Sequence, residues 1–525
     1  MNNKCQAITD KGKQCKRRAL SNEKYCKGHL YLKRPSKFKK RPFYKHPAFI
    51  IATSLAIISI LATIYYGHQT PTKKEMSGIV DEAFEKQLEE LGISPPKTYE
   101  EIRKATGKKC TEVGQAVCDK LKSATEELKD KRYLEAEISY KTLVDLLPDV
   151  VQLRSNLVDA YYYQGKFNEA INECREIIKI KDDYVEAYNS MGVAFAKQDS
   201  LGEAIKAFKE AIRIDSNYAE AHHNLGVAFK EQGRLADAIN QYRRAIEIRP
   251  DFATIHNSLG KALVDSGVLN DAIQEYRIAI EIKPDYADAH FNLGVALRKQ
   301  GELDSAIEQY HIAIRIDSVY AKAYNNLGNA LADKGEFKDA IKQLLMAIQM
   351  KPKYAIAYNN LGCVLAKQGN LEEATKQFRE AIRIEPDLPQ AHKNLGDVLI
   401  EQDKLDEAVE QYREAIRINP DYSEAHKELG NTFAKQAKSD DAILELSEAI
   451  RIDPNDAEAQ NNLGIALAKK GNLIEAIQKF STVLRINHNS VDARSNLVKA
   501  LKLQGKSEKE IKEYIESIIG RNISK

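Results

Sequence analysis

The sequence predicts an all-α protein whose body is a superhelical solenoid of helix–turn–helix repeats, preceded by a short metal-binding head and one transmembrane helix. Three observations predict this fold class. A pattern of about 34 residues recurs between residues 151 and 490, residues 48–67 contain no charged side chain, and four potential metal ligands lie within residues 1–32. At 525 residues the chain exceeds the usual size of one core. A solenoid avoids that limit because each repeat packs only on its neighbours.

The repeat is clearest at Ala219–Gly226, which reads AEAHHNLG. Related octets begin at positions 287, 321, 355, 389, 423 and 457, so the period is constant. Within residues 219–252, apolar and small residues recur at helical spacing in two stretches. Gly233 marks the turn between the stretches, and Pro250 follows the second stretch, where a helix must end. Each repeat is therefore predicted to be a pair of helices.

This pattern resembles the tetratricopeptide repeat (TPR), whose period is about 34 residues. The family's small residue at the helix crossing falls on Gly226 and Gly260, and its second-helix alanine falls on Ala238 and Ala272. The resemblance implies a TPR-like repeat domain at 117–525. Full repeats start at residues 151, 185, 219, 253, 287, 321, 355, 389, 423 and 457, a degenerate repeat starts at 117, and a partial capping repeat starts at 491.

Residues 1–32 are predicted to form a zinc-binding head. Cys5, Cys15, Cys26 and His29 have the spacing C-x9-C-x10-C-x2-H. A Cys3His set is a common closed structural zinc site, and metal binding would supply the folding energy that so short a segment lacks. The segment also resembles small Cys3His zinc-binding modules at the ends of bacterial and viral proteins. Structural zinc is the expected cofactor, and the alternative is four reduced, unligated side chains.

Residues 33–47 form a basic juxtamembrane segment. Residues 1–47 contain 15 Lys and Arg residues against only Asp10 and Glu23. Such a run acts as a topology determinant, attracts anionic lipid headgroups, or contacts nucleic acid. We favour the first interpretation, because the segment has no recognition-helix signature for nucleic acid.

Residues 48–67, AFIIATSLAIISILATIYYG, are predicted to be a transmembrane helix. About 20 apolar residues span a bilayer, whereas a signal peptide has a shorter apolar run and a small-residue cleavage site. A buried core helix is the other alternative. Seven Lys and Arg residues lie in 28–47 against three in 68–87. This asymmetry predicts a single-pass membrane protein with a cytoplasmic N-terminus and extracytoplasmic repeats.

Residues 68–116 are predicted to be a helical connector. Cys110 and Cys118 lie eight residues apart at the junction with the repeats. An exported connector would allow them to form a disulfide, and the alternative is two free thiols.

The repeats show no pattern typical of an enzyme. They contain neither a glycine-rich phosphate loop nor a G-x-S-x-G motif. Histidines occupy the fourth position of five repeats, but tyrosine occupies it in three others, so we interpret this position as half-buried packing. Packed helices lie about 8–10 Å apart, too far for these histidines to share a metal ion. The five are His222, His256, His290, His392 and His426. We therefore expect no catalytic activity.

The sixth position of the repeat, which we call the asparagine column, is expected to line a concave peptide-binding groove. Its asparagines are Asn156, Asn224, Asn292, Asn326, Asn360, Asn394, Asn462 and Asn496, interrupted by Ser190, Ser258 and Glu428. Amides at a fixed rise can donate to and accept from an extended peptide backbone. The column resembles the asparagine ladder of the repeat domain of O-linked N-acetylglucosamine transferases, which holds peptides in that manner. The alternative is that these asparagines only cap or pack within the repeats.

The sequence as a whole predicts a membrane-anchored TPR scaffold that binds proteins or extended peptides in its groove. One alternative is a non-catalytic accessory subunit of a membrane or envelope enzyme such as a glycosyltransferase. Another is a nucleic-acid tether acting through the zinc-stabilised basic head.

Overall fold

A computed structural model of the chain describes residues 110–520, and every regular element in that range is an α-helix. The chain divides into two compact units, residues 1–210 and 211–525. The predicted zinc head (1–32), basic segment (33–47), transmembrane helix (48–67) and connector up to residue 109 lie outside the described residues.

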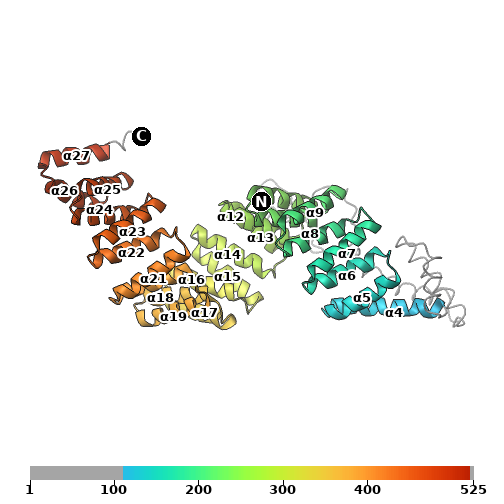
Figure 1. The fold of residues 1–525 in the computed structure, drawn as a ribbon. Helices are drawn as coiled ribbons and strands as arrows, with labels where there is room; N and C mark the ends of the chain where they lie inside the picture. Colours follow the sequence, from blue (N-terminus) through green and yellow to red (C-terminus); the bar gives the residue numbers. More distant parts are fainter. Residues whose placement is uncertain (1–109, 521–525) are drawn as a thin grey trace, which may run out of the picture. The chain divides into compact units, whose positions relative to one another are not determined.

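The described helices form consecutive pairs, one pair for each repeat (Figure 1). The first helices of the pairs are similar in length apart from the longer α4, which begins at Cys110, before the predicted repeat start at 117. They are α4 (Cys110–Lys129), α6 (Val151–Tyr163), α8 (Val185–Lys197), α10 (Ala219–Glu231), α12 (Ala253–Asp265), α14 (Ala287–Gln300), α16 (Ala321–Asp333), α18 (Ala355–Lys367), α20 (Pro389–Glu401), α22 (Ser423–Lys435), α24 (Ala457–Lys469) and α26 (Val491–Leu503).

The second helices of the pairs are equal in length apart from α27, which is one residue shorter. They are α5 (Tyr133–Leu146), α7 (Phe167–Ile180), α9 (Leu201–Ile214), α11 (Leu235–Ile248), α13 (Leu269–Ile282), α15 (Leu303–Ile316), α17 (Phe337–Met350), α19 (Leu371–Ile384), α21 (Leu405–Ile418), α23 (Ser439–Ile452), α25 (Leu473–Ile486) and α27 (Glu508–Gly520). The predicted partial repeat at 491 is thus a complete helix pair. Its second helix buries Ile511 and Ile518.

A glycine closes many of the first helices. Gly301 follows α14 with φ 87°, a left-handed conformation that lacks the steric penalty of a Cβ atom only in glycine. Its N–H donates to the carbonyl groups of Leu297 and Arg298 in the last turn of the helix. The chain reverses there, and α15 runs back against α14.

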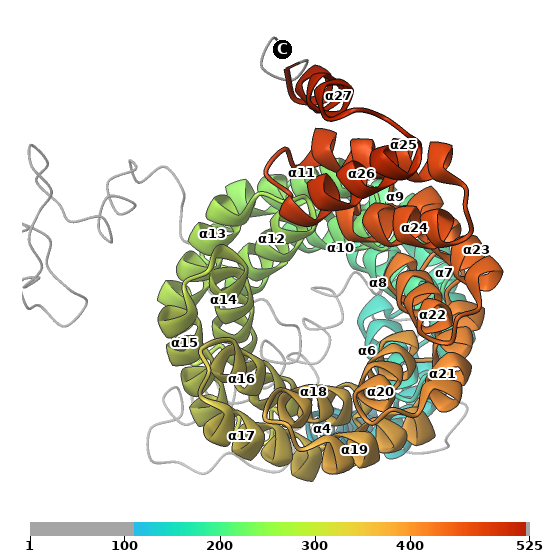
Figure 2. The same ribbon diagram turned by 90° about the vertical axis from the view of Figure 1, so that its left-hand side faces the viewer.

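Within the second compact unit, the first helices lie on the inner side of the curve and the second helices on the outer side (Figure 2). This arrangement is visible for α10, α12, α14, α16, α18 and α20, which face the centre of the view, while α13, α15, α17 and α19 lie outside them. We call the side of residues 211–520 formed by the first helices the inner surface. The members of the asparagine column from Asn224 onward lie on these inner helices.

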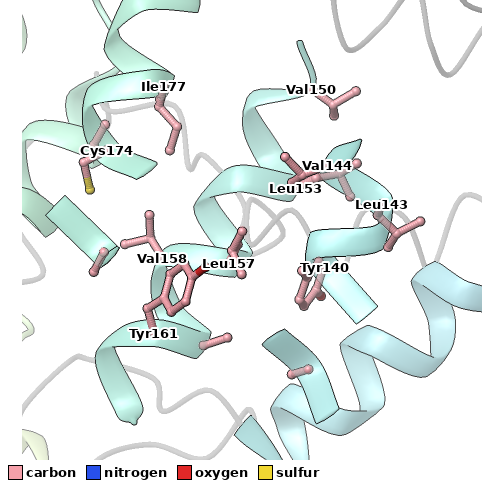
Figure 3. Packing of buried hydrophobic residues seen from close by; sticks show 14 of the residues in the cluster. Tyr140, Leu143, Val144, Val150, Leu153, Leu157, Val158, Tyr161, Cys174 and Ile177 are labelled. Carbon is pink, nitrogen blue, oxygen red and sulfur yellow. The ribbon is translucent and has the colours of Figure 1, made fainter. Parts of the chain in front are cut away.

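In the first compact unit, the core fills the space between consecutive helix pairs. Tyr140 of α5, Leu157 and Tyr161 of α6, and Cys174 and Ile177 of α7 are all buried there (Figure 3). Burial raises the pKa of the Cys174 thiol to about 12, so it is protonated at neutral pH. Cys174 is therefore a core side chain.

In the repeats that start at residues 185 to 457, a close contact joins a first-helix glycine to a large side chain of the second helix. A Cβ atom on Gly260 would lie 2.5 Å from Cε1 of Tyr276, so only glycine fits against the ring. The same contact occurs between Gly192 and Phe208, Gly226 and Tyr242, Gly294 and Tyr310, Gly362 and Phe378, Gly396 and Tyr412, and Gly464 and Phe480. Leucine replaces the ring against Gly328 and Gly430.

The fourth-position histidines tie the two helices of a repeat to the loop before it. In His426, Nε2 donates to the carbonyl of Pro420 at 3.1 Å and Nδ1 donates to Oε2 of Glu445 at 2.7 Å. A carbonyl oxygen and a carboxylate both accept hydrogen bonds, so this pair of partners favours the charged, doubly protonated ring. The bond to Glu445 raises the pKa of His426, although burial opposes the shift. These histidines are buried packing residues, as predicted, and His222, His290 and His392 face Gln241, Gln309 and Gln411 instead.

The structure corrects the predicted localisation as a single-pass membrane protein with a cytoplasmic N-terminus and extracytoplasmic repeats. Among residues 110–520, no helix combines the length and apolar character that a bilayer span requires. All of these helices except α4 are shorter than the roughly 20 residues needed. The longer α4 carries seven charged residues. Residues 48–67 lie outside the described range, and we withdraw the membrane localisation.

Replacing Gly260 with alanine should destabilise the repeats around α12 and α13. The added methyl group overlaps the Tyr276 ring, an overpacking that costs about 1–3 kcal/mol, reduced by up to ~1 kcal/mol of improved helix propensity. Gly202→Ala is the matched control, because Gly202 is helical and a Cβ there meets no atom within 4 Å. Thermal unfolding should show a lower Tm for G260A and an unchanged or slightly higher Tm for G202A. Equal effects of the two changes would contradict the steric explanation.

The His426–Glu445 pair should make local stability depend on pH. Because folding raises the pKa of His426, its stabilising contribution is complete below the unfolded value near 6.5 and is lost as pH rises through the folded pKa. Glu445→Gln should therefore cost about 1–2 kcal/mol at about pH 5.5 and less at about pH 8.5. Amide hydrogen exchange of α22 and α23 measures this difference. The control is Gln411→Ala, which removes an uncharged partner of His392. A cost of E445Q that is the same at both pH values would rule out a charged pair.

Candidate functional site

The asparagine column runs along the first helices with its side chains half-buried. All eight predicted members fall within the described residues, on α6, α10, α14, α16, α18, α20, α24 and α26. A half-buried amide has both a protein side and an exposed side. Its hydrogen bonds therefore show how much of the amide is used inside the protein.

At four joints between repeats, the column asparagine donates to the asparagine at the fifth position of the preceding repeat. The bonds from Nδ2 to Oδ1 join Asn292 to Asn257 at 2.9 Å, Asn360 to Asn325 at 2.9 Å, Asn394 to Asn359 at 3.0 Å, and Asn496 to Asn461 at 3.1 Å. Each bond spans 35 residues and crosses from one first helix to the next. The column therefore links consecutive repeats.

The acceptors in these bonds are residues that sequence reasoning missed. Asn257, Asn325 and Asn359 are only 2%, 4% and 8% exposed, so their amides need partners inside the protein. A signal was present in the Asn-Asn doublets that begin at residues 325, 359 and 461. Consecutive residues of a helix point about 100° apart. One asparagine of each doublet can therefore face its neighbouring repeat while the other faces the inner surface.

Where the fifth position cannot accept, the column asparagine bonds elsewhere. Phe291 holds the fifth position of the repeat before Asn326, and Asn326 donates instead to the carbonyl of Lys322 in its own helix at 3.0 Å. Lys427 holds the fifth position of the repeat before Asn462, and Asn462 donates instead to Oδ1 of Asn431 at 2.9 Å. These exceptions support the rule that the column asparagine donates to the fifth-position side chain of the preceding repeat wherever that side chain can accept.

The remaining members show local variants of the same contact. Asn156 donates to the hydroxyl of Tyr140 at 3.1 Å and accepts from Gln152 at 3.1 Å. Asn224 bonds its neighbour His223, and this bond opposes the lowering of the His223 pKa by burial. His223 in turn bonds the hydroxyl of Ser258, in the next repeat, at 3.0 Å. Ser258 thus continues the link between repeats where it interrupts the asparagine column.

Ion pairs join some inner helices at their C-terminal ends. Lys230 of α10 lies 2.9 Å from Asp265 of α12, and Arg298 of α14 lies 2.7 Å from Asp333 of α16. Together with the hydrogen bonds between asparagines, these ion pairs engage polar side chains of the inner surface in contacts between repeats.

The described part of the chain holds little of the predicted cysteine and metal chemistry. Residues 110–520 contain no group of three or more metal-ligating side chains, and Cys5, Cys15, Cys26 and His29 lie outside this range. Cys110 and Cys118 both belong to α4. Their separation along the helix places their Cα atoms about 12 Å apart, whereas a disulfide spans at most about 7 Å. A bond between them would require α4 to be broken.

Comparison with protein families identifies the repeats. The model named TPR repeat matches residues 159–199, 195–233, 228–267 and 260–301. The model for the C-terminal domain of cilia and flagella-associated protein 70, also a TPR domain, matches residues 285–517. No curated protein matches the chain.

Solved structures with similar folds include TPR proteins. MamA is 30% identical over 31% of this chain and 95% of its own, with a TM-score of 0.29. YrrB, described as a TPR protein with an unusual peptide-binding site, is 22% identical over 35% of this chain and 95% of its own, with a TM-score of 0.31. Yeast Tom70 is 14% identical over 78% of this chain and 99% of its own, with a TM-score of 0.43.

The regularly spaced helix pairs, the glycine contacts between their helices and the two TPR family models agree. Residues 159–517 of the chain consist of tetratricopeptide repeats.

Proposed function

We propose that the inner surface of residues 211–520 binds an extended segment of another protein, with column asparagines contacting its backbone. The observation that supports this proposal is that the column amides use only some of their hydrogen-bonding groups inside the protein. Asn292, Asn394, Asn462 and Asn496 each donate to a neighbouring repeat, and their carbonyl oxygens accept no hydrogen bond from the described residues. These oxygens are available to a ligand.

The bonds between repeats favour such binding instead of preventing it. An amide whose nitrogen is held by a buried acceptor has a fixed orientation, so a ligand does not have to order it. An extended backbone presents N–H groups at a regular rise of about 3.3 Å per residue. A row of oriented carbonyl oxygens can accept from such a backbone whatever its sequence.

Other inner residues would then select among sequences. The ninth position of the repeat varies between Val295, Cys363 and Asp397, all half-buried. Apolar, thiol and carboxylate side chains at equivalent places give each repeat a different preference. The proposal assigns the described repeats a binding role and no catalytic step.

The double substitution Asn292→Ala and Asn394→Ala should weaken peptide binding. Each lost hydrogen bond contributes about 1 kcal/mol, so the affinity should fall roughly tenfold or more. The full-length chain can be screened against a random library of short, end-capped peptides, and the best binders can be titrated by calorimetry. The control is Asn240→Ala, because Asn240 is exposed on the outer helix α11.

Folding must be followed in parallel, because the double variant also removes two bonds between repeats. Circular dichroism at the titration temperature identifies loss of structure. If the variant stays folded and binds the selected peptides as tightly as the natural protein does, the asparagine column is not the binding surface.

A further inference from the structure

The column residue of repeat 423–456 is Glu428, between Asn394 and Asn462 of the neighbouring repeats. It lies half-buried on α22. Asn462 donates to Asn431 at 2.9 Å, and Asn431 donates to Oε2 of Glu428 at 3.3 Å. The carboxylate is therefore the last acceptor of an amide chain that runs from α24 to α22. A carboxylate only accepts hydrogen bonds and carries a charge, so it presents chemistry that an asparagine cannot.

The nearest lysines are occupied by other carboxylates. Lys393 holds the fifth position of the preceding repeat, the place that pairs with the column residue at other joints, but its Nζ atom lies 2.9 Å from Oδ2 of Asp397. Asp397 also accepts from the hydroxyl of Tyr412 at 2.9 Å. Lys393 thus forms its ion pair within its own helix.

Lys427, the residue beside Glu428 in the sequence, has its own partners. Its Nζ atom lies 2.8 Å from Oε2 of Glu458 and 3.4 Å from Oδ2 of Asp456. Within the described residues, no lysine, arginine or histidine forms an ion pair with Glu428. The inner surface thus holds a half-buried carboxylate that forms no ion pair within the described residues.

Such a carboxylate carries an electrostatic cost in the free protein. Burial raises the pKa of Glu428, and the charges of Asp397 and Glu458 raise it further, against the opposing effects of Asn431 and Lys427. A cation supplied by a ligand would compensate the buried charge and form a charge-assisted hydrogen bond. The ammonium of lysine and the guanidinium of arginine are the cations that a polypeptide offers.

We propose that Glu428 selects a lysine or arginine side chain in the extended segment that binds the inner surface. This inference rests on the proposed function. The column asparagines hold the backbone of the segment, and Glu428 determines which residue stands at one place along it. The partner is therefore a protein with an extended, basic segment.

The full-length chain and the same library of capped peptides test this inference. The natural protein should select peptides with a lysine or arginine at one position. Glu428→Gln keeps the shape and removes the charge, and it should abolish the preference, with affinities for a selected peptide and its Lys→Gln analogue becoming equal within about twofold. Glu410→Gln on the outer helix α21 removes the same charge at an exposed place and should leave the preference unchanged.

The pH dependence of binding gives a second measurement. Only the ionised carboxylate attracts a cation, so the affinity for the basic peptide should rise as pH increases through the raised pKa of Glu428. E428Q should show no such rise. A merely structural role of Glu428 would not produce a ligand-dependent difference between the two proteins.

Three outcomes separate the two proposals. If the natural protein binds no peptide, the proposed function fails. If it binds peptides without a basic preference, or if E428Q keeps that preference, only the role of Glu428 is overturned. A lower Tm of E428Q than of the natural protein would show that the charge of Glu428 already stabilises the free protein and would also overturn the inference, which expects no loss of stability in E428Q.

Discussion

The structure depends on one steric constraint, the contact between a first-helix glycine and a second-helix side chain. At Gly260 the Tyr276 ring occupies the space of a Cβ atom. This contact sets the distance and the angle between the two helices of the repeat, because a close-packed core has little freedom to adjust. Its recurrence from one repeat to the next gives consecutive repeats the same geometry. Equivalent side chains therefore form columns, and the asparagine column is one of them.

The bonds between repeats follow from that geometry. With equivalent first helices at a constant offset, a fifth-position residue meets the column residue of the next repeat, as Asn257 meets Asn292 and Asn359 meets Asn394. In a solenoid each repeat contacts only its neighbours, so the stability of the domain depends on the interfaces between adjacent repeats. A buried amide pair at an interface also favours the correct register, because a shifted pairing would leave a buried amide without a partner.

Much of the fold was predictable from the sequence, and the reason is physical. Val151, Val185, Ala219 and the later predicted repeat starts are the first residues of their helices, because small residues and turn glycines occur at fixed places in the repeat. The sequence did not predict that α4 starts at Cys110, because α4 lacks the octet that recurs in the first helices of the other repeats. The partners of the column asparagines could not be predicted either. They depend on how two repeats pack, whereas the period of the sequence describes one repeat at a time.

The polar balance of the inner surface limits what it can bind. Its cations are largely engaged within the protein, as Lys230, Lys393 and Lys427 illustrate. Column asparagines such as Asn292 and Asn394 use an N–H group on a neighbouring repeat and leave a carbonyl oxygen as an acceptor, and Glu428 adds a carboxylate. All of these groups are acceptors, so a ligand must supply donors. An extended polypeptide supplies donors through its backbone N–H groups. A basic side chain adds a positive charge that can pair with the Glu428 carboxylate. An extended segment without a basic side chain would leave the Glu428 carboxylate without a charged partner, which costs free energy on binding. Under the proposed function, the same bonds that join the repeats also determine the kind of partner that the inner surface accepts.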